Sequence, residues 1–256
     1  MAAEESDVSL RQSHSPDAVQ QRLERPARAQ YLADAVLGAI DGCVTTFAVV
    51  SGVVGAGFST TVGIVLGLSN LVADGFSMAV SNYEAAKANQ ERIDQLHSME
   101  QQHIERIPEG EREEIRQIYA RKGFSGEVLS AVVDTITSDR KLWIETMLVE
   151  EHGVIKAANS PVGAACATFG AFVVVGFVPL LPLLDPTQAT AVSYLFSALL
   201  AALMFFSIGG IKSWHLGQPV LSGGAKPLLS GGSAAALAFI VGYLLRQVFD
   251  VGGALV

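Results

Sequence analysis

A stretch of 32 consecutive residues without formal charge separates Asp41 from Asp74. The segment from Gly55 to Thr60 divides it, so the stretch predicts a hairpin of two membrane-spanning helices. Each carboxylate would then lie about 25 Å from the turn, inside a hydrocarbon layer of roughly 30 Å, because a helix rises ~1.5 Å per residue. An ionisable side chain at that depth costs about 2.5–3.5 kcal/mol on insertion scales and is expected to be functional. The two carboxylates therefore predict that the chain moves a cation.

The composition favours an all-α protein embedded in a membrane. Half of the residues are hydrophobic and only 16% are charged, and further uncharged runs of spanning length follow. Five transmembrane helices are expected, at residues 33–55, 60–86, 160–183, 188–211 and 229–249. The expected organisation is a polar N-terminal segment (1–30), helices 1 and 2 (31–86), a cytoplasmic helical metal-binding domain (87–158) and helices 3 to 5 (159–256). The first 30 residues lack an apolar h-region, so no cleavable signal peptide is predicted.

The basic residues predict which side of the membrane each segment faces. Of the 17 Lys and Arg residues, 16 lie before the first span, in the insert or between the fourth and fifth spans. Cytoplasmic segments are enriched in Lys and Arg, so the N-terminus and the insert are expected in the cytoplasm and the C-terminus on the other side. We predict an integral, multi-pass protein of the cell (inner) membrane if the chain is bacterial, or of a vacuolar-type membrane if it is eukaryotic. The net charge of −8 gives no indication of nucleic-acid binding.

The insert is expected to form a small antiparallel helical domain on a stalk. No Gly or Pro occurs from Phe76 to Ile107, so the second span is expected to continue unbroken into the cytoplasm. Pro108-Glu109-Gly110 is expected to break it. Ser125 is the expected N-cap of the second of the three shorter helices that follow. These are expected at about residues 111–122, 125–137 and 139–152.

Side chains of the insert have the spacing of metal ligands. Glu100 and His103 lie three apart on the stalk, and Glu111 and Glu114 repeat this spacing on the next helix. The last helix adds a thioether and two carboxylates: Met147, Glu150 and Glu151. Such a set favours a first-row divalent ion such as Fe²⁺, Mn²⁺, Co²⁺ or Zn²⁺ over Ca²⁺ or Mg²⁺. The metal is expected as substrate and ligand, and no prosthetic group is predicted.

A solvated acidic face is the alternative to a metal site on the insert. Glutamates three apart are common on exposed helices, and Arg106, Arg112 and Arg116 could pair with these acids. The spacing alone leaves both interpretations open.

Four segments resemble signatures of the vacuolar iron transporter family. DGCVTTFAVVSG (41–52) resembles the family's first-helix signature, and NLVADGFSMA (70–79), continuing to SNY (81–83), resembles the second. IYARKGFS (118–125) and MLVEE (147–151) resemble its cytoplasmic segment. The resemblance covers residues 30–250 in order. It implies a homodimer with five spans per protomer that exports Fe²⁺ from the cytosol in exchange for protons, along a path near the two-fold axis.

The resemblance also implies roles for individual residues. It implies that Asp41 and Met78 hold the metal within the membrane. It further implies that the cytoplasmic domain binds metal through the following residues: Glu100, Glu111, Glu114, Met147 and Glu151. His103 stands where the family has a glutamate. Imidazole can still bind a metal, but the lost negative charge favours softer ions and leaves the transported metal open.

The first two spans fit a membrane site on physical grounds. Asn70, Asp74 and Met78 recur every four residues on the second span, and Asp41 and Thr45 do so on the first. Glycines along both helices allow close helix approach. A carboxylate in a low-dielectric environment favours its protonated form, so Asp41 is expected to carry a proton when empty and to ionise when the cation arrives. Metal and proton would then compete for one site, which couples their movements.

Some of these residues have other interpretations. Asp74 could hydrogen-bond to Asn82 instead of binding metal, and a threonine hydroxyl such as that of Thr45 more often donates to the helix backbone. Glu84 lies where the cytoplasmic mouth is expected, either as part of the transport path or as an interfacial charge.

Other classes of function remain open from the sequence. A membrane-anchored metal sensor or storage protein would bind metal without transport, and a structural helical protein would bind none. Within transporters, Mn²⁺ is the closest rival to Fe²⁺. Enzyme activity is not expected, because a ferroxidase centre uses several Glu-x-x-His pairs on facing helices and Glu100-x-x-His103 is the only one here.

Overall fold

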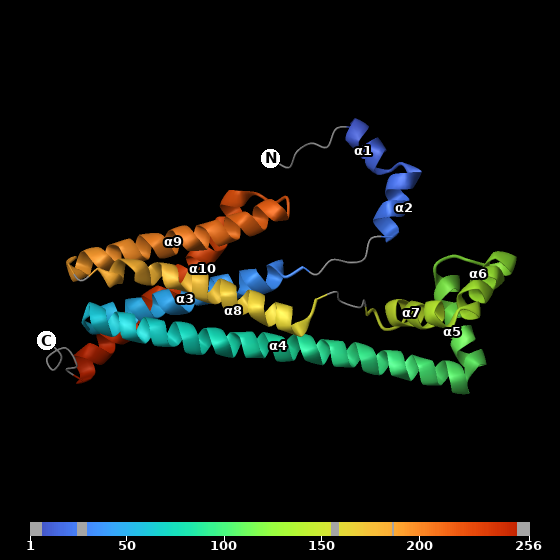
Figure 1. The fold of residues 1–256 in the computed structure, drawn as a ribbon, viewed down its shortest axis with the longest axis horizontal. Helices are drawn as coiled ribbons and strands as arrows, with labels where there is room; N and C mark the ends of the chain where they lie inside the picture. Colours follow the sequence, from blue (N-terminus) through green and yellow to red (C-terminus); the bar gives the residue numbers. More distant parts are fainter. Residues whose placement is uncertain (1–6, 25–29, 155–158, 186, 250–256) are drawn as a thin grey trace. The chain divides into compact units, whose positions relative to one another are not determined.

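The structure, a computed structural model, describes residues 7–24, 30–154, 159–185 and 187–249. Residues 1–6 and 25–29 of the predicted N-terminal segment and 155–158 of the predicted insert lie outside the described residues. Every regular element within the described ranges is a helix (Figure 1). Two short helices, α1 (Asp7–Ser13) and α2 (Pro16–Glu24), come first.

Five helices are long and apolar enough to cross a membrane. They are α3 (Leu32–Ala56), α4 (Thr60–Arg106), α8 (Pro161–Phe177) with its 3₁₀ continuation η1 (Val178–Leu184), α9 (Thr190–His215) and α10 (Val220–Phe249). This confirms the prediction of an all-helical protein with five candidate membrane spans. The fifth begins at Val220 rather than near residue 229, because the helix continues through Pro227, which spanning helices tolerate where neighbouring helices surround them.

The chain forms two compact units. One comprises residues 1–83 and 159–256, and is called the membrane unit here; the other, residues 84–158, is called the insert. Helix α4 contributes its first part to the membrane unit and its last part to the insert. Its unbroken course to Arg106 agrees with the predicted stalk.

The hairpin between α3 and α4 turns where the sequence predicts. Helix α3 ends at Ala56, and Gly57 follows with a φ of 72°. The N–H of Gly57 donates to the carbonyl of Val54, and that of Phe58 to the carbonyl of Val53. Glycine suits this left-handed position because it has no Cβ to clash, so Gly57 ends the helix.

Glycines let α3 lie directly against the backbones of α8 and α10. A Cβ on Gly42 would lie 2.4 Å from the carbonyl oxygen of Phe172 in α8. One on Gly55 would lie 2.2 Å from that of Phe239 in α10. The predicted close approach along α3 is therefore made to helices far away in the sequence.

One amide joins three helices of the membrane unit. The side-chain nitrogen of Asn82 on α4 donates to Asp34 Oδ1 on α3 (2.8 Å) and to Thr168 Oγ1 on α8 (2.7 Å). A third, longer contact reaches the carbonyl of Ala164 (3.3 Å). Asn82 is thus committed to these partners, which argues against the alternative that it bonds to Asp74.

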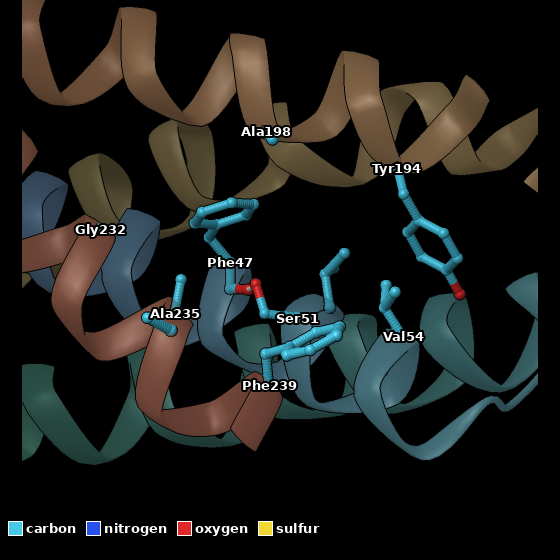
Figure 2. Close-up of a pocket in the computed structure, with 10 residues that line it drawn as sticks. Phe47, Ser51, Val54, Tyr194, Ala198, Gly232, Ala235 and Phe239 are labelled. Atoms are coloured by element: carbon cyan, nitrogen blue, oxygen red, sulfur yellow. Dashed lines mark hydrogen bonds between the residues drawn. The ribbon is translucent and has the colours of Figure 1, made fainter. Parts of the chain in front are cut away.

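An apolar cavity of about 340 Å³ lies between α3, α9 and α10 (Figure 2). Phe47, Phe239 and Tyr194 are among its lining side chains, and the Ser51 hydroxyl donates to the carbonyl of Phe47 at 2.8 Å. Its described lining carries no carboxylate. The cavity therefore does not suit a cation.

The insert packs three helices beside the end of α4. These are α5 (Pro108–Arg121), α6 (Gly126–Ser138) and α7 (Arg140–Glu150). The predicted break of the stalk helix occurs here, since α4 ends at Arg106, but α5 begins at Pro108 itself, with only Ile107 between them, rather than near Glu111. Proline is favoured at a first helical position, where no backbone N–H is needed. Ser125 does precede α6, but its side chain makes no capping hydrogen bond.

Candidate metal centre

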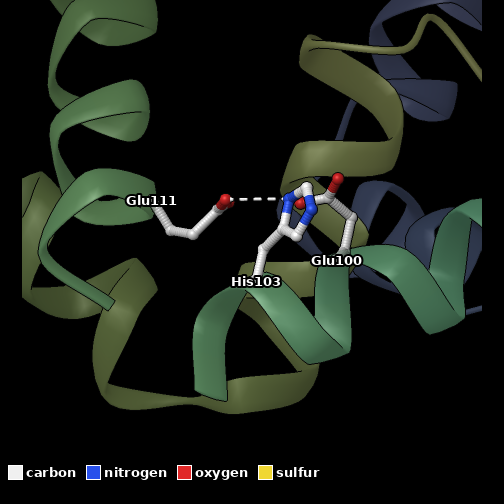
Figure 3. Close-up of side chains that lie close together, drawn as sticks. All are labelled: Glu100, His103 and Glu111. Atoms are coloured by element: carbon white, nitrogen blue, oxygen red, sulfur yellow. Dashed lines mark ion pairs between the residues drawn. The ribbon is translucent and has the colours of Figure 1, made fainter. Parts of the chain in front are cut away.

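Two glutamates and a histidine meet where α4 turns into α5 (Figure 3). Glu100 and His103 lie one turn apart near the end of α4, and Glu111 lies in the first turn of α5. The single residue between the helices folds α5 back, so the three side chains converge. His103 Nδ1 lies 3.2 Å from Glu111 Oε1, and each residue offers a ligand atom within 4.8 Å of the others.

The two carboxylates of this group are buried and incompletely paired. Glu100 and Glu111 are each 1% exposed, and the Oε2 atom of each lacks a hydrogen-bond donor. Burial, followed by the negative charges of Glu100 and Glu114, raises the pKa of Glu111 to about 8. Two adjacent buried carboxylates repel each other and need a cation or a shared proton between them.

A second group shares Glu100. His152 Nε2 lies 2.8 Å from Glu100 Oε1 and 3.7 Å from Glu151 Oε2. Glu100, Glu151 and His152 offer ligand atoms within 4.8 Å of one another. Burial, with the charge of Glu114 next, raises the pKa of Glu151. The sequence analysis missed His152, whose only signal was its position next to Glu151.

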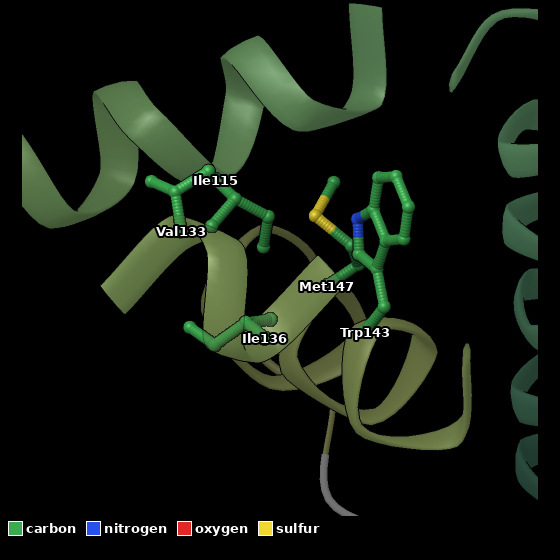
Figure 4. Close-up of a cluster of buried hydrophobic side chains, with 5 residues drawn as sticks. All are labelled: Ile115, Val133, Ile136, Trp143 and Met147. Carbon is green, nitrogen blue, oxygen red and sulfur yellow. The ribbon is translucent and has the colours of Figure 1, made fainter. Parts of the chain in front are cut away.

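The remaining predicted ligands of the insert have different surroundings. Met147 lies in the apolar core, packed with Trp143 and Ile115 (Figure 4). Glu150 pairs with Lys122. Glu114 is exposed, and its charge acts on both groups described above. The core explains why Met147 is buried, whereas its predicted role as a ligand stays a prediction.

Two of the arginines that could have paired with the predicted ligands pair with other acids instead. Arg112 pairs with Asp134, and Arg116 Nε lies 3.3 Å from Glu113 Oε2. These arginines therefore do not neutralise Glu100 and Glu111.

The predicted membrane-site residues lie on α3 and α4. Asp41, Asp74 and Met78 are half-buried, and Asp74 is close enough to Asp41 for their charges to interact. The side-chain nitrogen of Asn70 is buried and lacks a hydrogen-bond partner. Thr45 Oγ1 donates to the carbonyl of Asp41 at 2.9 Å, the backbone bond considered for it above. Glu84, by contrast, is exposed and belongs to the insert.

Comparison with known proteins identifies the family. Residues 32–243 match the family model of the VIT family. The chain belongs to the VIT family. This VIT-family protein is 30% identical over 229 residues to a vacuolar iron transporter of Toxoplasma gondii, covering 86% of this chain and 76% of the relative. It is 31% identical over 208 residues to vacuolar iron transporter 2 of Oryza sativa subsp. japonica, covering 80% and 84%.

A further relative is vacuolar iron transporter 1 of Arabidopsis thaliana, with 28% identity over 216 residues that cover 84% of this chain and 86% of the relative. These matches confirm the resemblance found in the sequence. The family is one of transporters, which agrees with the expectation that this VIT-family protein is an integral membrane protein and not an enzyme.

Proposed function

We propose that this protein transports Fe²⁺ out of the cytosol in exchange for protons. The five candidate spans and the family membership support a membrane transporter, and the names of the relatives support iron as the cargo. Mn²⁺, Zn²⁺ and Co²⁺ are the competing cargoes, because the same ligand types bind them.

The observation that carries the metal assignment is the pair of buried carboxylates in the insert. Glu100 and Glu111 each present an oxygen without a donor, beside the imidazoles of His103 and His152. Oxygen and imidazole ligands together suit a divalent first-row transition metal. We propose that the insert lies in the cytoplasm, gathers the ion there and delivers it to the membrane unit.

Asp41 and Asp74 would carry the ion through the membrane. Two half-buried carboxylates whose charges interact attract a divalent cation, and a proton on Asp41 would compete with it. Met78, one turn beyond Asp74, would add a thioether that suits Fe²⁺. Binding of the metal would then displace a proton, which couples the two fluxes.

We also propose that the protein is a homodimer with the path near its two-fold axis. Helix α4 exposes Val72, Phe76 and Val80 close to Asp74. An apolar surface beside the transport residues suits either lipid or a second protomer, and a path shared by two protomers would place four aspartates around the ion.

Metal flux in proteoliposomes tests the proposal. Purified protein is reconstituted, and uptake of Fe²⁺ and of Mn²⁺ is measured with and without a pH gradient. Asp41→Asn keeps the shape of the side chain but cannot ionise, so flux and its dependence on the gradient should be lost. Asp185→Asn is the matched control, because Asp185 lies outside the candidate spans, where its carboxylate accepts hydrogen bonds from Thr187.

Normal, gradient-driven uptake by Asp41→Asn would contradict the antiport mechanism. A sensor or storage protein predicts metal binding by the wild type with no flux at all, and dispensability of Asp41. Size-exclusion chromatography of both variants checks folding and the dimer.

A further inference from the structure

His152 occupies a position that the family resemblance does not assign. It follows the last turn of α7, where the backbone N–H of Glu151 donates to the carbonyl of Met147. Gly153 then adopts a φ of 63°, and the N–H of Val154 donates to the carbonyl of Leu148 at 2.9 Å. The left-handed glycine ends the helix and fixes where the imidazole lies.

The imidazole faces carboxylates through one nitrogen. Nε2 lies 2.8 Å from Glu100 Oε1 and 3.7 Å from Glu151 Oε2. The side chain of His152 is 17% exposed and that of Glu100 1%. Nε2 and Glu100 Oε1 are within hydrogen-bond distance, and the ring nitrogen is the donor whenever the carboxylate is ionised.

Two similar pairs stand next to each other in the insert. Glu100 Oε1 pairs with His152, and Glu111 Oε1 pairs with His103. In each pair the second carboxylate oxygen is buried and lacks a donor. Glu100 belongs to both groups of potential ligands, so it can bridge two neighbouring cations.

We propose that His152 is a metal ligand of the insert, which binds an ion through Nε2 together with Glu100 and Glu151. The ion is a divalent transition metal that accepts mixed oxygen and imidazole ligands, and it lies next to the position formed by Glu100, His103 and Glu111. This inference rests on the proposed metal-gathering role of the insert. It adds an imidazole that no pattern in the sequence indicated.

Several physical features favour an ion at this place. The C-terminal end of a helix carries partial negative charge, which attracts cations to the end of α7. The unpartnered Oε2 of Glu100 gains a partner when an ion binds. Ligands bind an ion at about 2.0–2.2 Å, so two ligand atoms of one ion lie at most about 4.4 Å apart, and the three ligand atoms here already lie within 4.8 Å of one another. When Nε2 binds the ion, the ring hydrogen lies on Nδ1.

The experiment uses the full-length protein in detergent, with Zn²⁺ as the probe. X-ray absorption detects bound imidazole through scattering from the outer atoms of the ring. In His103→Gln, imidazole scattering should persist, because His152 supplies it. It should disappear when His152→Gln is added.

Calorimetry measures the affinity of the same variants. His152→Gln should weaken one phase of Zn²⁺ binding by about 10–100-fold, even though glutamine keeps a hydrogen-bond donor for Glu100. His97→Gln is the matched control, because His97 lines a separate groove of the insert with Ile93 and Lys141. It should change neither signal.

The outcomes separate this inference from the proposed function. If Zn²⁺ binds but His103→Gln alone removes all imidazole scattering, His152 is not a ligand and the metal-gathering role stands. Unchanged binding by folded His152→Gln overturns the inference in the same way, since the side chain would then be only a hydrogen-bond donor. If the wild type binds no Zn²⁺, the metal-gathering role and this inference both fail.

Discussion

Metal binding by the insert should depend steeply on pH because Glu111 must lose a proton. Its pKa of about 8, raised by burial and then by Glu100, means that the side chain is protonated at neutral pH in the metal-free protein. A divalent cation needs the ionised carboxylate, so binding releases this proton. At pH 6.5, about 1.5 units below this pKa, only about one Glu111 side chain in 30 is ionised. The cation should therefore bind about 30-fold more weakly at pH 6.5 than above pH 8.

The same shift makes the metal-free protein less stable as the pH rises. The pKa of Glu111 is raised from 4.5 in the folded state, so the folded chain holds more protons than the unfolded chain between pH 4.5 and about 8. Stability is therefore greatest below the unfolded value and falls as the pH rises through this window.

Calorimetry of Co²⁺ binding in buffers of different ionisation enthalpy counts the released protons. Measurements between pH 6.5 and 8.5 report mainly on the Glu111 carboxyl, because an ordinary histidine titrates near pH 6.5, at the lower end of this range. Glu111→Gln should bind weakly at every pH and lose most of the pH dependence. Glu145→Gln, an exposed residue 3.8 Å from Lys141, is the control and should behave as the wild type.

Equal affinity of the wild type at pH 6.5 and 8.5, without proton release, would refute the reasoning. So would an unchanged pH dependence in Glu111→Gln, because the released proton would then come from another group.

Two further predictions concern the membrane unit. Gly42→Ala should lower the thermal unfolding temperature in detergent and cost about 1–3 kcal/mol of stability, because the added Cβ would lie 2.4 Å from the carbonyl oxygen of Phe172. Gly170→Ala is the control and should not lower it, because the space around its Cβ is open. Equal losses in both variants would contradict the packing argument. Asn82→Leu should cost about 1–3 kcal/mol in the same assay, because it leaves the acceptors on α3 and α8 without their donor. An unchanged unfolding temperature would show that this amide does not hold the helices together.

Helix boundaries in the membrane unit, apart from the start of α10, could be predicted closely because they follow from local properties. The length of an uncharged run limits a span, and Gly57 at a left-handed position ends α3 where the sequence places the turn. The start of α5 was expected near Glu111 but lies at Pro108, because a proline can either end a helix or begin one. Only the tight connection through Ile107 shows that Pro108 begins the helix.

The candidate site was predicted in part. The spacing of Glu100 and His103 on one helix identified neighbours, since residues three apart share a helix face. Their meeting with Glu111 depended on how sharply α5 folds back. Spacing alone could not distinguish the pairing of Glu150 with Lys122 from a ligand role, because Lys122 caps α5, Glu150 ends α7, and the sequence does not state how these two helices pack.

The sequence by itself determined the class of the protein, its five candidate spans and the ionisable residues that a membrane environment makes unusual. These features follow from composition and from periodicity, which can be recognised within short stretches of the sequence. Only the tertiary structure decided which glycines of α3 contact α8 and α10, and that His152 joins Glu100 from the end of α7. Such contacts join residues 52 or more positions apart, and they form because packing of the hydrophobic core, rather than any local pattern, sets where helix ends meet.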